Sequence, residues 1–187
     1  MLDTESSVIN RDSELDGARA LALLRWKRGH RAFHFILEGM INLSQSCRRS
    51  LQSGNHRSLS QRLEELAGLF QSATAAFKYA AAFDAELYAK VVRPTMMPPY
   101  VPAGFSGSLN GKHDEMTQAL QRLQKDLSGV FGRQWPEPVK QAWDDVLRAK
   151  GENLRNHGLI CSQFVPGGQS LLRDYYSQQA KGSSADD

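Results

Sequence analysis

The sequence is poor in cysteine, with only Cys47 and Cys161 among 187 residues. The two lie far apart and no Cys-x-x-Cys pair occurs, which excludes a disulfide framework and is typical of a reducing compartment. The first residues, MLDTESSVINRDSELD, are polar and acidic and lack the apolar segment and cleavage site of a secretory signal. We therefore predict a cytoplasmic protein.

Long apolar runs are also missing. The longest weakly polar stretch, FKYAAAFDAELY, is interrupted by charges well before the ~20 apolar residues that a membrane-spanning helix needs. Charge of one sign is scarce too, because 23 basic and 20 acidic residues leave a net charge of +3. Such a charge does not indicate nucleic acid as a partner. Basic residues are dense only at Arg25, Lys27, Arg28 and Arg31, without the aromatic pattern of a base-stacking platform, so we interpret them as a solvated helix face.

Apolar residues make up 41% of the chain and charged residues 23%, a composition that suits one globular domain with a real core. Apolar positions recur with a helical period from Leu21 to Leu51 and again from Leu59 to Val91. Turn and capping residues bound these segments. The pattern predicts helices over 15–52, 58–92, 112–130, 137–164 and 169–180.

The predicted fold is therefore all-α: a bundle of two long antiparallel helices with two to three further helices. A single domain over 15–180 lies between flexible ends at 1–14 and 181–187. The helices are interrupted by a Pro/Gly-rich loop, PTMMPPYVPAGFSGSLNG, at 94–111. A connection this long in a small helical domain is usually functional.

One histidine of the predicted fourth helix shares a face with apolar residues. Leu154, Ile160, Cys161 and Phe164 lie three, four or seven positions from His157, so we expect its ring to face the core. A buried neutral imidazole needs a partner for each nitrogen, and metal coordination through one nitrogen with a hydrogen bond from the other satisfies both. Haem iron fits this description, and so does a core histidine bonded within the protein.

The first helix presents a matching face with His30, Phe33, His34, Leu37 and Ile41 on one side. Such a face is suited to cover an aromatic cofactor or substrate. His30, His34 and Glu38 follow one another at a metal-compatible spacing. A dinuclear carboxylate bundle would need Glu-x-x-His pairs on separate helices, which the sequence lacks, so this run is a weak metal signal.

Four segments in order carry a family resemblance: AFHFILEGMINL (32–43), LYAKVVRPTMMPPYVPAGFSGSLNGKHDEM (87–116), WDDVLRAKGENLRNHGLICSQF (143–164) and VPGGQSLLRDYY (165–176). With them the chain resembles a short, divergent member of the tryptophan 2,3-dioxygenase and indoleamine dioxygenase superfamily of haem proteins. This superfamily includes relatives that hydroxylate tyrosine or rearrange tryptophan. The order is preserved over about 18–176.

The resemblance implies a haem-dependent oxygenase that binds haem b, iron protoporphyrin, with His157 as the proximal iron ligand. It implies an aromatic amino acid or indole-type substrate, O2 or peroxide as oxidant, and a homo-oligomer, either a dimer or a tetramer. The further cofactor contacts that it implies are Phe33, Leu37, Gly167 and Gly168. The catalytic candidates are His34 and Ser106, and the substrate contacts are Phe105, Ser106, Gly107, Lys112 and Ser170.

The sequence departs from the family pattern on the substrate side. Leu37 and Glu38 stand where the tryptophan dioxygenases have a distal histidine and glutamine, so His34 or His30 would have to serve as the base. Gly111 stands near the place of the substrate-carboxylate arginine, leaving Lys112 or His113 as replacements. Pro166 replaces the threonine before the Gly-Gly pair. Dioxygenation of an indole and hydroxylation of a phenol therefore both stay open.

Cys161 follows His157 by four residues, so both side chains can reach one haem, the thiol by attachment to a vinyl group. A free cysteine is also often a small core residue. Two other function classes remain open. One is a non-enzymatic helical interaction module with the Pro/Gly-rich loop as its docking surface. The other is a nucleic-acid binder that uses the basic residues of the first helix.

Overall fold

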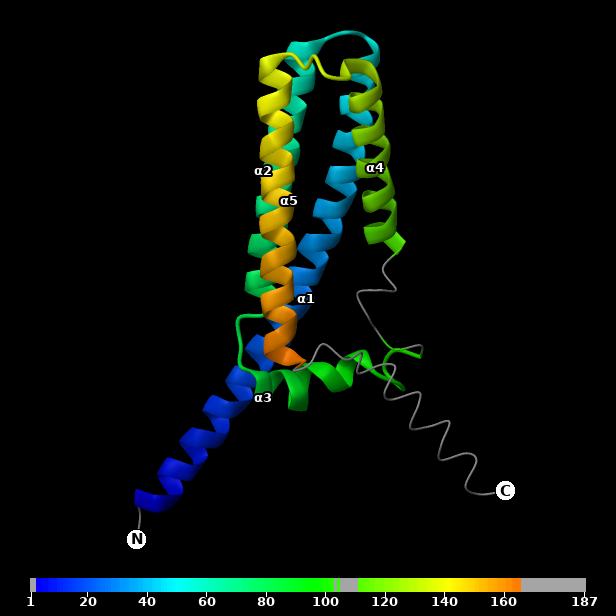
Figure 1. Cartoon of the computed structure of the whole chain (residues 1–187). Helices are drawn as coiled ribbons and strands as arrows, with labels where there is room; N and C mark the ends of the chain where they lie inside the picture. The colour runs from blue at the N-terminus through cyan, green and yellow to red at the C-terminus, as the bar shows by residue number, and fades with distance from the viewer. Residues whose placement is uncertain (1–2, 103, 105–110, 166–187) are drawn as a thin grey trace, which may run out of the picture.

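The computed structural model describes residues 3–102, 104 and 111–165, and side chains from residue 14 onward. Its elements, in chain order, are α1 (Asp3–Gln52), α2 (His56–Ala80), α3 (Ala85–Leu87), η1 (Tyr88–Val92), η2 (Arg93–Met96), α4 (Gly111–Phe131) and α5 (Glu137–Phe164). No strand occurs in the described ranges. The predicted all-α fold class is confirmed (Figure 1).

Four long helices form the bundle (Figure 1). α2 packs against both α1 and α5, and α4 packs against α1. The main core joins all four helices through apolar side chains at helical spacing, because burying one stripe of each amphipathic helix removes apolar surface from water. Its largest fully buried members include Leu37, Met40, Leu59, Leu63, Leu66, Leu123, Leu127, Val139 and Val146.

A second, smaller cluster lies at the lower end of the bundle. The segment from α3 to η2 crosses this end (Figure 1), and its Tyr88, Val92 and Met96 pack with Ala22 of α1. Phe164, at the end of α5, packs against the same cluster. The domain therefore has two separate apolar clusters rather than one continuous core.

Two of the predicted helix boundaries are wrong. α1 begins at Asp3, not at residue 15. The predicted helix over 58–92 ends at Ala80, where the chain turns before Asp84 starts the crossing segment by accepting a hydrogen bond from the backbone N–H of Leu87 at 2.7 Å. Apolar spacing continues across this turn because the residues beyond it are buried in the second cluster. Leu21 and Leu24, which begin the apolar period of the first helix, are 45% and 40% exposed.

The later helices agree with their predicted bounds to within one residue, since α4 spans Gly111–Phe131 and α5 spans Glu137–Phe164. Pro138 lies in the first turn of α5, where a missing N–H costs nothing. The predicted last helix over 169–180 lies outside the described residues.

α1 and α2 are in close contact at Gly29. A Cβ atom built on Gly29 would lie 2.4 Å from the Cβ of Ala80 and 2.8 Å from its Cα. Gly68, in α2, has nothing within 4 Å of the same position. The contact with the last residue of α2 therefore requires glycine at position 29.

We expect Gly29→Ala to lower the free energy of unfolding by about 1–3 kcal/mol, the usual cost of overpacking. The matched change Gly68→Ala should raise stability by up to about 1 kcal/mol, because alanine is the better helix former. Urea unfolding followed by circular dichroism measures both. Equal effects of the two substitutions would contradict the close contact.

Candidate functional site

His157 does not face the core, so that prediction is wrong. His157 is exposed. The structure describes α5 to its end at Phe164, and no residue of this helix after Ala149 is buried. The apolar stripe of α5 continues through Ile160 and Phe164 but is only half-covered there. His157 is exposed because of the tertiary structure: neighbouring helices cover more of the first half of α5 than of the second.

Phe77, His113 and, on the same helix, Cys161 interact with His157. Its ring stacks on Phe77 of α2, with the ring centroids 5.0 Å apart and the planes inclined by 22°. Its Nε2 lies 3.4 Å from the Sγ of Cys161. Partial burial lowers the pKa of His157 below its usual value, and the nearby His113 lowers it further. The imidazole is therefore neutral near pH 7.

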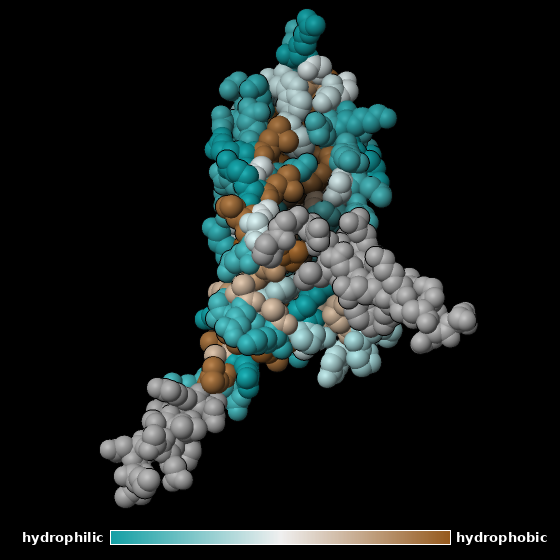
Figure 2. Space-filling model, turned by 60° about the horizontal axis from the view of Figure 1, so that its bottom comes forward, coloured by the Kyte–Doolittle hydropathy of each residue, from teal (hydrophilic) through white to brown (hydrophobic). Residues whose placement is uncertain are grey.

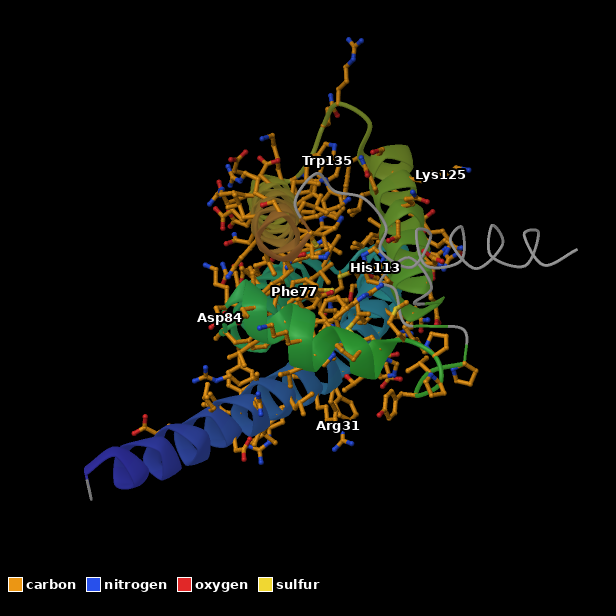
Figure 3. The ribbon with its side chains drawn as sticks, turned by 90° about the horizontal axis from the view of Figure 1, so that it is seen from below. Arg31, Phe77, Asp84, His113, Lys125 and Trp135 are labelled. Carbon is orange, nitrogen blue, oxygen red and sulfur yellow. The ribbon has the colours of Figure 1, made fainter. Side chains whose placement is uncertain are left out.

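His113 reaches this place from the first turn of α4. In Figure 3, which looks at the lower end of the bundle, Phe77 and His113 both lie toward the middle of the view, between α5 and α4. The lower ends of α4 and α5 stand apart in Figures 1 and 3. α2, α4 and α5 thus bring together Phe77, His113 and His157, which lie far apart in the sequence.

Apolar side chains remain uncovered near this end of the bundle. Leu154, three residues before His157 and on the same side of α5, is 57% exposed. Leu159 is 70% exposed but lies two residues from His157 and so faces another side of the helix. Figure 2 shows hydrophobic side chains gathered between two hydrophilic flanks on this face. A surface of this kind marks a place where a ligand or partner can bind.

The face predicted on the first helix is only partly directed to this site. Phe33 packs on Phe77 with ring centroids 4.3 Å apart and so joins the aromatic group under His157. Leu37, expected to contact a cofactor, is instead fully buried in the main core. Because the residue has no exposed surface, it lies behind Phe33 and supports it rather than facing a ligand directly.

The polar residues of that face pair locally. The Nε2 of His34 lies 3.6 Å from a carboxylate oxygen of Glu38. The Nδ1 of His30 lies 2.9 Å from the carbonyl oxygen of Trp26, and burial lowers the pKa of His30. Lys112, at the start of α4, forms an ion pair with Glu115 at 2.9 Å. The negative charge of Glu38 also raises the pKa of Lys112. His34 and Lys112 therefore lie along neighbouring edges of α1 and α4.

Several predicted site residues cannot be placed. Phe105, Ser106, Gly107, Gly167, Gly168 and Ser170 lie outside the described residues. Within the described ranges no three His, Cys, Asp or Glu side chains gather as a metal site, which leaves the His30–His34–Glu38 run without support as one. None of the helices described has the length and hydrophobicity that crossing a bilayer would require.

The basic run of α1 is a helix surface, as interpreted. Arg31 points away from the bundle in Figure 3. Arg25 donates a hydrogen bond to the carbonyl oxygen of Ala82, which ties α1 to the turn after α2. At least one of these cations thus has a structural contact.

Two aromatic residues and one arginine at the site were missed from the sequence. Phe77 is one of many apolar residues at helical spacing, and only the fold makes it the partner of His157. Tyr88 stacks on Phe164 with ring centroids 4.5 Å apart and lies near the thiol of Cys161. Burial raises the pKa of the Tyr88 hydroxyl, while the positive charge of Arg93 acts in the opposite direction. The Arg93-Pro94 corner gave a signal for a helix end but none for a binding group.

With this geometry established, comparison with known proteins identifies the family. The model of the SfmD 3-methyl-L-tyrosine peroxygenase family matches residues 9–142, more than two thirds of the chain. The chain belongs to this family. The match ends in the first half of α5, so His157 and Cys161 lie beyond it.

A relative described as a 3-methyl-L-tyrosine peroxygenase, from Streptomyces lavendulae, is 29% identical over 151 residues. The aligned region covers 80% of this chain and 39% of the relative, so the chain spans about two fifths of the length of that protein. No solved structure matches the chain.

We expect His113→Gln to raise the pKa of His157, because it removes a group whose positive charge disfavours protonation of the second imidazole. Titration of the ring resonances by NMR measures the shift. His56→Gln is the control, since His56 contacts Phe131 at the opposite end of the bundle. An unchanged pKa of His157 in the His113 variant would show that the two rings do not interact.

Proposed function

We propose that this chain forms the haem-binding bundle of an oxidative enzyme that acts on an aromatic amino acid, with His157 as the iron ligand. The observation that carries the proposal is the exposed, neutral imidazole of His157 held against Phe77 near the lower end of the four-helix bundle, where α4 and α5 stand apart. Membership in the 3-methyl-L-tyrosine peroxygenase family supports the reaction class.

The donor chemistry of the residues fits haem. A ligating imidazole must be neutral and must expose one nitrogen, and the lowered pKa and exposure of His157 meet both needs. Stacking on Phe77 fixes the plane of the ring. The Nε2 atom and the Sγ of Cys161, 3.4 Å apart, lie on the same side of α5, so a single group can be held by both residues.

The surroundings suit a flat apolar group. Phe33 and Phe77 form an aromatic wall that links α1 to α2, and the exposed Leu154 lies on the same side of α5 as His157, which stacks on Phe77. Burying these surfaces against a macrocycle removes them from water. This arrangement supports haem between the first and fourth long helices better than a filled core would.

Bound haem supplies iron with a coordination position for O2 or peroxide, and the polarity of the pocket directs the outcome. The chain's own residues do the rest. Phe33 and Phe77 exclude water and orient an aromatic ring by stacking. His34, paired with Glu38, is placed to hold or pass a proton at its imidazole. Lys112, which is paired with Glu115, is the cation that the resemblance implies for the carboxylate of an amino acid.

The finer assignments rest on the resemblance to the tryptophan dioxygenase superfamily. They include haem b, the roles of Phe105, Ser106 and Gly107, the Gly167-Gly168 loop with Ser170, and a dimer or tetramer. The family match favours peroxide as the oxidant and hydroxylation of a phenol over dioxygenation of an indole.

An absorption spectrum of the full chain, before and after addition of haem, tests the proposal. We expect a Soret band typical of histidine-ligated haem in the wild type and its loss in His157→Ala. His56→Ala is the matched control, because His56 is also an exposed histidine in contact with an aromatic ring. Absence of the band in the wild type would favour the non-enzymatic interaction module, and identical spectra of the two variants would exclude His157 as ligand.

We also propose that Cys161 can attach haem covalently. Burial raises the pKa of its thiol, which therefore stays protonated near pH 7. Addition of the S–H bond across a vinyl group places sulfur on one carbon and hydrogen on the other, so no external oxidant is consumed.

Acid-acetone extraction should then leave haem on the wild-type protein and release it from Cys161→Ser. Cys47→Ser is the control, since Cys47 is buried in the main core. Complete extraction from the wild type would contradict covalent attachment without affecting ligation by His157.

A further inference from the structure

Arg93 has a buried nitrogen with no hydrogen-bond partner. It begins η2, in the segment that crosses the lower end of the bundle, and its Nη2 atom is shielded from solvent yet unpaired. A buried charged N–H without an acceptor is costly, and native proteins rarely leave one. The unpaired atom therefore marks a position for an acceptor.

Arg93 interacts with the hydroxyl of Tyr88. The positive charge of its guanidinium lowers the pKa of that hydroxyl, against the larger effect of burial. The acids of the same segment have other contacts, because Asp84 caps the backbone of Leu87 and Glu86 pairs with Lys90 at 2.7 Å. Among the described residues no ion pair to Arg93 occurs. Its positive charge lies against aromatic and apolar side chains instead.

Tyr88 connects this charge to the candidate site. The ring of Tyr88 stacks on Phe164 in the last turn of α5. The Tyr88 hydroxyl also interacts electrostatically with the thiol of Cys161, which raises the pKa of Tyr88. Cys161 in turn contacts His157. The guanidinium is thus one side chain removed from the pair proposed to hold haem.

We propose that Arg93 and Tyr88 form an anchoring site for a carboxylate of a ligand bound at the lower end of the bundle. This inference rests on the proposed function for the identity of the ligand, since both a haem propionate and an aromatic amino acid carry that group. A guanidinium binds a carboxylate through two parallel N–H···O bonds, and the Tyr88 hydroxyl adds a third polar group. The unpaired Nη2 supplies one of the two donors.

The test compares each acid with its ester, so that only the carboxylate changes. The first pair is metal-free protoporphyrin IX and its dimethyl ester, and the second is 3-(4-hydroxyphenyl)propionate and its methyl ester. Quenching of tryptophan fluorescence measures the affinity of each compound for the full chain. Trp26 reports on the site because the ring centroids of Trp26 and Tyr88 lie 6.1 Å apart. Neither pair contains iron, so failure of ligation by His157 leaves this test unaffected.

We expect the wild type to prefer the acid over the ester in at least one pair. Arg93→Gln should reduce that preference by about 10- to 100-fold, and Arg93→Lys should retain part of it. The matched control is Arg148→Gln on the exposed surface of α5, where Arg148 pairs with Asp145. If the preference for the acid falls only in the porphyrin pair, the anchored group is a haem propionate. If it falls only in the phenol pair, the anchored group is a substrate carboxylate.

Circular dichroism checks that the variants fold. Should Arg93→Gln fail to fold, Tyr88→Phe and Arg93→Lys test the proposal instead. We expect each of them to prefer the acid over the ester several-fold less than the wild type does. An unchanged preference in the folded Arg93 variants, or no preference in the wild type, would overturn the proposal.

Discussion

The close contact between α1 and α2 at Gly29 and Ala80 determines the geometry of the lower end of the bundle. α2 ends there, and Phe77, one turn earlier, is held against Phe33 of α1 and beneath the ring of His157. The chain then turns and crosses the bundle end, which brings Tyr88 to Phe164. A constraint on backbone separation, rather than a polar contact, thus positions the aromatic wall of the site.

The helical class and the bounds of α4 and α5 follow from local sequence signals. Apolar spacing, the proline in the first turn of α5 and the turns between helices depend on neighbouring residues only. The end of α2 does not, because apolar spacing continues from Ala80 to Val92 across the turn. That spacing has two causes, since Ala73 belongs to the main core while Tyr88 and Val92 belong to the second cluster. Periodicity alone does not separate them.

The candidate site was only partly predictable for a related reason. His157 and Phe33 were both predicted from the sequence as cofactor contacts, and in the structure both pack on Phe77. The exposure of His157 was not predicted, because the cover over α5 depends on where α4 begins and how far these two helices diverge. Phe77 and Arg93 carry no local signal, since a phenylalanine at helical spacing and an arginine before proline are ordinary. Their significance comes from contacts between segments that are distant in the chain.

The division of the interior into two apolar clusters has a consequence for motion. The free energy of a local opening depends on the contacts that it breaks, and opening of the crossing segment breaks mainly those of the smaller cluster. The leucine-rich core can stay intact while Tyr88, Val92 and Met96 separate from Ala22. Opening of the crossing segment can therefore expose the lower end of the bundle while the main core stays assembled.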